Sequence, residues 1–95
     1  MIERSTSGFS EAVHDLLRDR GWTQKRLARA ACVDPGFLSR VLHGHCPPSP
    51  ELAARVEDAF ELPCDFFPER REHAVIQAIR RDPVLRDRIY ERLAR

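Results

Sequence analysis

The chain has 95 residues, 42% of them apolar, which is enough for one compact soluble domain. No apolar run approaches the ~18 residues of a membrane span. The start, Met1-Ile2-Glu3-Arg4, lacks a basic region followed by an apolar stretch, so we expect no secretion signal. The three cysteines are odd in number and widely spaced, which argues against a disulfide framework. We therefore expect a cytoplasmic protein with free thiols, no membrane contact and no cofactor.

The formal net charge is only +1, but the charges are unevenly distributed along the chain. Residues 1–19 have a net charge of −2, and residues 20–45 carry five basic residues against Asp34 alone, a net of +4. Residues 46–68 have a net charge of −4, and residues 69–95 carry eight arginines against five acids, a net of +3. Because a local basic patch attracts a polyanion whatever the total charge, residues 20–45 are the first candidate for nucleic-acid contact.

Helical spacing of apolar residues predicts the first two helices. The stripe of the first helix is Phe9, Ala12, Val13, Leu16 and Leu17, at i, i+3, i+4, i+7 and i+8. Gly21 follows and suits a helix C-terminus. Thr23 can cap a second, short helix that buries Leu27, Ala28 and Ala31.

A polar cap followed by proline then occurs three times, at Asp34-Pro35, Ser49-Pro50 and Asp82-Pro83. Each pair places an N-cap oxygen before a residue whose φ already suits the first helical turn. Gly44 and Pro63 end the first two of these helices, and a further helix is expected from about Glu69 to Arg81. The sequence therefore predicts six helices and no strands.

Two short helices joined by a tight turn, with a capped and basic second helix, outline a helix-turn-helix at roughly Thr23 to Gly44. The run Gly21-Trp22-Thr23-Gln24-Lys25-Arg26-Leu27-Ala28 resembles the opening of the Cro/cI-type repressor family, also called the XRE family. The resemblance continues through Leu38-Ser39-Arg40-Val41, Gly44 and Pro48-Ser49. It ends at Asp65-Phe66-Phe67, so it covers about residues 9 to 68.

The resemblance implies an all-α fold. Residues 1–68 would form a five-helix, lambda-repressor-like DNA-binding domain, and residues 69–95 an added C-terminal helix or helical hairpin. It also implies a transcription regulator, which we expect to be a repressor, acting as a homodimer on a near-palindromic operator. The helix from Asp34 to His43 would then lie in the major groove of double-stranded DNA.

The expected base-reading residues depart from the family pattern at Pro35 and Gly36, where members often carry polar side chains. These two residues offer only apolar contact or close backbone approach. Base reading then depends on Ser39 and above all on Arg40, which can bond guanine O6 and N7 together. Phe37 either contacts thymine methyl groups or packs on Val41 one turn later.

The expected backbone contacts come from the preceding helix and from the end of the reading helix. The resemblance places Gln24 against the DNA backbone, and helix N-terminal amides near Thr23 can add phosphate contacts. The candidate phosphate ligands are Lys25, Arg26, Arg29, His43 and His45. In the turn, Cys32 stands where the family commonly has glycine, so the backbone there either does not need a positive φ or tolerates one at some cost. Leu42 replaces a commonly acidic residue and is expected in the core.

Three other interpretations of the sequence compete with DNA binding: a metal site, an enzyme and a protein-interaction module. His43-Gly44-His45-Cys46 brings three potential metal ligands together, but the paired spacings of zinc sites are absent, and Cys32 and Cys64 suit small buried positions better. No glycine-rich phosphate loop, nucleophile elbow or paired acidic motif predicts an enzyme. The stronger alternative is a protein-interaction module on a helix-turn-helix scaffold that has lost specific DNA reading.

The last segment carries two apolar stripes, one around Val75 and Ile79 and one formed by Leu85, Ile89 and Leu93. Such a helical pair either binds a second copy or covers the core of its own domain, because an amphipathic helix looks the same in both cases. The residues expected at a dimer interface are Phe66, Phe67, Leu85, Ile89 and Leu93.

Overall fold

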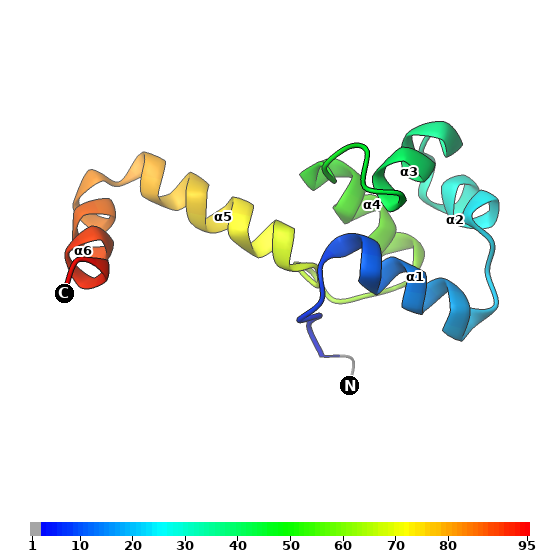
Figure 1. Cartoon of the computed structure of the whole chain (residues 1–95), viewed down its shortest axis with the longest axis horizontal. Helices are drawn as coiled ribbons and strands as arrows, with labels where there is room; N and C mark the ends of the chain where they lie inside the picture. The colour runs from blue at the N-terminus through cyan, green and yellow to red at the C-terminus, as the bar shows by residue number, and fades with distance from the viewer. Residues whose placement is uncertain (1–2) are drawn as a thin grey trace.

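A computed structural model describes residues 3–95, and within that range the chain forms six α-helices and no strands (Figure 1). The helices are α1 (Phe9–Arg20), α2 (Gln24–Ala31), α3 (Pro35–Leu42), α4 (Pro50–Ala59), α5 (Pro68–Arg81) and α6 (Pro83–Leu93). The all-helical prediction is confirmed, and α5 begins one residue before the expected Glu69. None of these helices has the length and apolar content needed to cross a membrane.

Four of the six helices in the described range, α2, α3, α4 and α6, start at a local side-chain cap, as the sequence predicted. Thr23 accepts a hydrogen bond from the Arg26 amide at 3.1 Å, and Ser49 accepts one from the Leu52 amide at 3.0 Å. Asp34 and Asp82 cap α3 and α6 in the same way. Gly21 ends α1 in the left-handed conformation, with φ 66°, where the absence of a Cβ removes the steric penalty.

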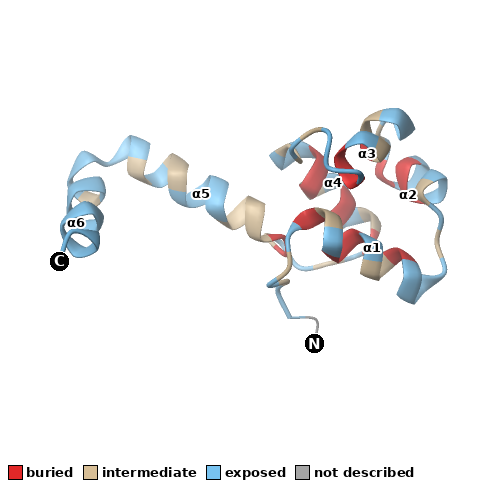
Figure 2. Ribbon diagram, viewed as in Figure 1, coloured by how far each residue is buried: buried red, intermediate tan, exposed pale blue. Residues whose placement is uncertain are grey.

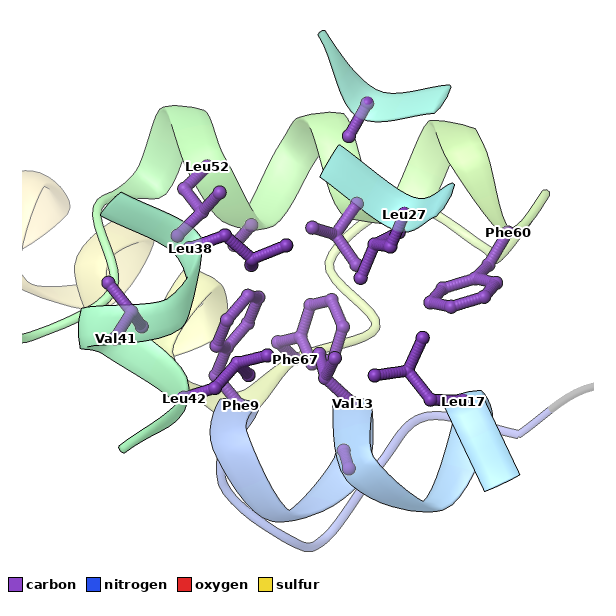
Figure 3. Packing of buried hydrophobic residues seen from close by; sticks show 14 of the residues in the cluster. Phe9, Val13, Leu17, Leu27, Leu38, Val41, Leu42, Leu52, Phe60 and Phe67 are labelled. Atoms are coloured by element: carbon purple, nitrogen blue, oxygen red, sulfur yellow. The ribbon is translucent and has the colours of Figure 1, made fainter. Parts of the chain in front are cut away.

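Helices α1 to α4 and the loop before α5 enclose one core (Figure 3). Its largest fully buried side chains are Phe9, Phe60, Phe67, Leu27, Leu38, Leu52, Val13, Val41 and Val56. The rings of Phe9 and Phe67 meet edge to face, with centroids 4.7 Å apart, so the start of α1 packs on the segment that leads into α5. Leu42 is 5% exposed, which confirms its expected place in the core.

Several other residues lie elsewhere than expected. Cys32 and Cys64 are exposed, so the expectation that both are small buried residues is wrong: each lies in a turn at the surface. Phe66 and Phe67 are buried in the core of their own domain. Because their side chains are covered within one chain, they offer no surface to a dimer interface.

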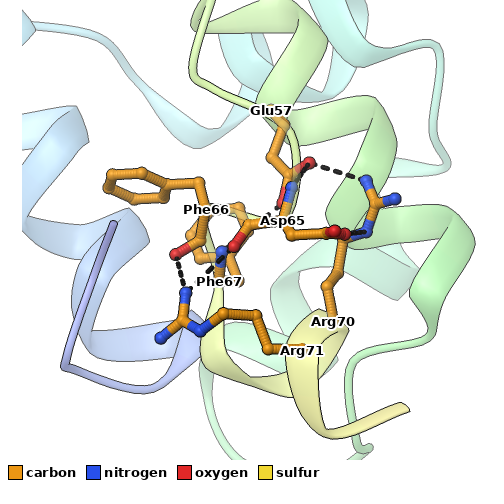
Figure 4. A network of polar contacts seen from close by, with 6 residues as sticks. All are labelled: Glu57, Asp65, Phe66, Phe67, Arg70 and Arg71. Atoms are coloured by element: carbon orange, nitrogen blue, oxygen red, sulfur yellow. Dashed lines mark hydrogen bonds and ion pairs between the residues drawn. The ribbon is translucent and has the colours of Figure 1, made fainter. Parts of the chain in front are cut away.

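A polar network fixes the base of α5 to the domain (Figure 4). The buried Glu57 of α4 accepts hydrogen bonds from the Phe67 amide at 3.4 Å and from the Arg70 guanidinium at 2.6 Å. Arg71 donates to the carbonyl oxygens of Phe66 and Ser5, at 2.8 and 2.7 Å. These contacts set the direction in which α5 leaves the domain.

Beyond this base, the chain extends away from the domain (Figure 2). We refer to residues 77–95, the last five residues of α5 and all that follows them, as the arm. Neither α5 nor α6 contains a buried residue. In Figure 1, α6 lies at the far end of α5 from the domain. The arm therefore does not cover the core of its own domain, which was one of the two expected roles of the last segment.

Candidate DNA-binding surface

The turn between α2 and α3 is held in a fixed conformation at Cys32. This residue has φ 56° and ψ 45°, the left-handed conformation that ends many helices. The Cys32 amide donates to the Arg29 carbonyl at 3.3 Å, and the Val33 amide donates to the Ala28 carbonyl at 3.0 Å. The positive φ is thus present and is tolerated by a residue other than glycine, which costs about 1 kcal/mol. It turns the chain so that α3 starts directly after α2.

Helix α4 supports this turn through Arg55. The Arg55 guanidinium donates to the Cys32 carbonyl at 2.7 Å and pairs with Glu51 at 3.0 Å. The sequence alone does not reveal this contact, since 23 positions separate the two residues and no local pattern links them. The bond satisfies a carbonyl at the C-terminal end of α2 and ties the helix-turn-helix to the rest of the domain.

One face of α3 is buried and the opposite face is open to solvent. Leu38, Val41 and Leu42 pack in the core. Pro35, Gly36, Arg40 and His43 are exposed and Ser39 is half-buried. At 100° per residue these positions form one continuous surface, which we call the reading face. All the predicted base readers except Phe37 lie on it.

Arg40 lies along the reading face beside Gly36. A Cβ atom built at Gly36 would come within 3.5 Å of Arg40 Nη1 and 3.1 Å of Asp34 Oδ2. The missing side chain at Gly36 therefore leaves space for the guanidinium over the first turn of α3. Arg40 is exposed and has no ion-pair partner within residues 3–95. Its five N–H donors are available to an acceptor outside the chain.

His43 ends the reading face with a defined ring orientation. Its Nδ1 lies 2.7 Å from the Ser39 carbonyl oxygen. A carbonyl oxygen only accepts hydrogen bonds, so this contact is a hydrogen bond in the tautomer whose Nδ1 carries the proton; the Ser39 hydroxyl lies 3.3 Å from the same nitrogen. The other ring nitrogen, Nε2, is then left for an outside partner. His45 follows in the loop, with its ring centroid 6.5 Å from that of His43.

Phe37 lies at the border between the reading face and the core. It is half-buried and packs against the core cluster. It also lines an open groove of about 260 Å³ with Val33, Leu52 and Arg55. Packing within the chain thus buries much of the Phe37 ring. Contact between the exposed remainder of the ring and thymine methyl groups stays a prediction.

The predicted backbone contacts of α2 divide into two groups. Lys25 and Arg29 are exposed and one helical turn apart, so both cations lie on the same side of α2. Arg26 instead stacks over the Trp22 ring, with 4.3 Å between its guanidinium carbon and the ring centroid. Gln24 is half-buried at the start of the helix, and the Thr23 hydroxyl is used in the cap. The stacking of Arg26 was not predicted, although Trp22 and Arg26 are one turn apart in sequence.

The metal hypothesis receives no geometric support, since residues 3–95 contain no group of three or more His, Cys, Asp or Glu side chains placed to hold an ion.

A family model described as helix-turn-helix matches residues 13–67, more than half of the chain. Neither the curated proteins nor the solved structures gave a match. The matched range contains α2, the Cys32 turn and all of α3, and it ends at the buried Phe67. The chain therefore belongs to the Cro/cI-type (XRE) helix-turn-helix family of DNA-binding transcription regulators.

Proposed function

We propose that this protein is a sequence-specific transcription regulator, acting as a repressor, that binds a near-palindromic operator with α3 in the major groove. The observation that carries the proposal is the reading face, on which Arg40 is exposed and has no ion-pair partner in the described chain. A guanidinium in the major groove bonds guanine O6 and N7 together, the commonest specific contact to a base. The Ser39 hydroxyl and His43 Nε2 offer further polar contacts beside Arg40, from side chains with a shorter reach.

Lys25 and Arg29 of α2 support the second part of the proposal, which is positioning on the DNA backbone. Their side chains are exposed and carry no acid partner within residues 3–95. Phosphate contacts of this kind set orientation and affinity without reading sequence. In this proposal α3 reads the base sequence and α2 contacts the DNA backbone.

The homodimer is proposed because one recognition helix touches too few base pairs to specify a genomic site. Two copies related by a two-fold axis place their recognition helices one DNA turn apart, about 34 Å. The large apolar side chains that are most exposed in the described chain lie in α5 and α6. Val84, Tyr90 and Leu93 are 62%, 68% and 80% exposed, and Ile89 is 36% exposed. Such side chains offer apolar surface to a second copy.

The test is a randomised-site selection with the wild type, followed by binding measurements on the recovered site with Arg40→Ala. We expect the variant to lose about 1–3 kcal/mol of affinity and to relax its preference at one base position in each half-site. Arg18→Ala is the matched control, since Arg18 is also exposed but lies on α1 and pairs with Asp15. An Arg40→Ala protein that keeps the affinity and the preferred sequence of the wild type would show that another residue reads the DNA.

A salt titration separates this function from that of a protein-interaction module. Binding to duplex DNA must weaken steeply with salt, because each neutralised phosphate releases counterions. A folded protein that binds neither random nor selected duplexes, even at low salt, would favour the module. The absence of polar side chains at Pro35 and Gly36 is the feature that keeps this second function in view.

A further inference from the structure

The arm carries a group of arginines that the proposed function does not use. The tail has eight arginines after Pro68, and three of them are engaged within the chain. Arg70 pairs with Glu57, Arg71 donates to backbone carbonyls, and Arg86 pairs with Asp87 at 3.0 Å. The others have no ion-pair partner within residues 3–95 and are exposed. These are Arg80, Arg81, Arg88, Arg92 and Arg95, which we call the arm arginines.

The acids nearby do not neutralise this group. Asp82 is occupied as the cap of α6, and Asp87 is occupied by Arg86. Glu91 is the acid of α6 that remains outside a pair or cap in the described chain. The Asp82 carboxylate keeps its negative charge while it caps α6, so the arm presents five unpaired cations against two carboxylates, a net charge of +3. A polyanion is the partner class that such a surface attracts.

Arg88 and Arg92 share one side of α6, next to its apolar stripe. Arg88 and Arg92 are one turn apart and line one shallow groove of about 410 Å³ together with Arg95. At 100° per residue, Arg88 and Arg92 lie on average about 80° from the middle of the stripe formed by Leu85, Ile89 and Leu93, and Leu85 lies only about 20° from Arg92. Leu85 and Ile89 also line the groove, so a partner on the basic side covers part of the apolar stripe and leaves mainly Leu93 free.

Helix α5, which carries the arm, leaves the domain next to the segment that follows the recognition helix. A groove of about 240 Å³ is lined by Pro47 and Pro48 of the α3–α4 loop and by His73 and Ile76 of α5. From there α5 runs outward (Figure 1). Its 14 residues span about 21 Å at 1.5 Å per residue. That length equals about six base pairs at 3.4 Å each.

We propose that the arm arginines bind DNA phosphates outside the sequence read by α3, so that each copy holds the duplex at its reading face and again on flanking DNA. The inference rests on the proposed function, because it needs the domain to be seated on DNA. It adds a sequence-independent contact that raises affinity and its salt dependence without changing the preferred operator. The partner of the arm is the phosphate backbone of the same duplex.

The first experiment compares two duplexes carrying the selected site, one ending at the site and one extended by about six base pairs or more at each end, the reach of α5. For the wild type, the slope of log affinity against log salt becomes steeper on the extended duplex by about 0.9 for each added phosphate contact. Equal slopes on the two duplexes would overturn the inference and leave the reading face untouched. No binding to either duplex would overturn the proposed function itself.

The second experiment changes the arginines. The double variant Arg88→Gln/Arg92→Gln should lower the salt slope by up to about two on the extended duplex and leave binding to the short duplex unchanged. Arg86→Gln is the matched control, because it removes a cation from the same helix on another side, where Asp87 already pairs with it. A double variant that binds the extended duplex with the wild-type slope, or a control that loses as much slope per charge, would refute the placement.

A third measurement tests whether the double variant is folded and whether its arginines contact a second copy of the chain instead of DNA. Far-ultraviolet circular dichroism and sedimentation of Arg88→Gln/Arg92→Gln should match the wild type, since glutamine is a good helix former and the apolar side is unchanged. Loss of self-association in this variant would assign the arginines to the contact between copies and overturn the DNA inference.

Discussion

Replacing Glu57 tests whether the buried network at the base of α5 holds the tail to the domain. Glu57 is 2% exposed and binds three groups: the Asp65 amide, the Phe67 amide and the Arg70 guanidinium. Glu57→Gln keeps the shape of the side chain but removes its charge. One of the two terminal atoms becomes an NH2 group, which cannot accept a hydrogen bond.

The expected loss follows from what remains in place. Leaving a fully buried charge without its partner costs about 3–5 kcal/mol. Here the Arg70 side chain is 23% exposed and keeps its second contact, to Asp65 at 3.3 Å. We therefore expect a smaller loss of about 2 kcal/mol in the free energy of unfolding. For a chain of this size that lowers Tm by about 8–16 °C.

Glu51→Gln is the matched control on the same helix. Glu51 also pairs with an arginine, but its side chain is 76% exposed. A surface pair of this kind contributes about 0–1 kcal/mol, so on the same scale the control should lower Tm by less than about 8 °C. Urea and thermal unfolding of the two variants measure both losses. Equal shifts for Glu57→Gln and Glu51→Gln would refute the reasoning that burial makes the Glu57 network the stronger one.

Four further variants test the turn, the cap and the backbone contacts. Cys32→Gly should raise the free energy of unfolding by about 0.5–1 kcal/mol, since glycine adopts the left-handed conformation without penalty; a lower Tm would show that the Cys32 side chain contributes more than its strain. Asp34→Ala should cost about 1 kcal/mol through loss of the α3 cap, measured by urea unfolding, and an unchanged midpoint would contradict the capping role. Lys25→Ala should lower the salt slope of DNA binding by about one without changing the preferred sequence, and Gln24→Ala should weaken all sequences about equally; a changed preference in either would contradict their assignment to the backbone.

The helix boundaries were predictable because the signals that fix them are local. At Asp34-Pro35, Ser49-Pro50 and Asp82-Pro83 the cap and the proline act within one turn of the helix they start, so the sequence contains the whole interaction. Core positions on α1 to α4 follow from helical spacing for the same reason. The order and type of the elements were therefore visible without coordinates.

Contacts between distant residues were not predictable in this way. Glu57 lies among acids in a segment of net charge −4, and nothing local marks it as the one that is buried. Its partner Arg70 is 13 positions away, and Arg71 reaches Ser5 across 66 positions. Cys32 and Cys64 were misjudged because the usual burial of cysteine was applied to residues that lie in surface turns. The direction of the arm depends on the same long-range contacts.

The internal pairing also changes how the charge distribution bears on DNA binding. The sequence gives residues 1–68 a net charge of −2, which weighs against a polyanion as partner. Yet of the five acids between residues 46 and 68, three are bound within the chain: Glu51 to Arg55, and Glu57 and Asp65 to Arg70. Paired charges contribute little to the potential that a distant phosphate experiences, since their fields largely cancel and salt screens the remainder. The potential near α2 and α3 is therefore set by exposed cations such as Lys25 and Arg40, which face no such partner. Glu57 and Asp65 share one arginine, and Asp58 and Glu61 form no ion pair within residues 3–95, so pairing weakens the opposition of the acidic segment to binding at the reading face without removing it.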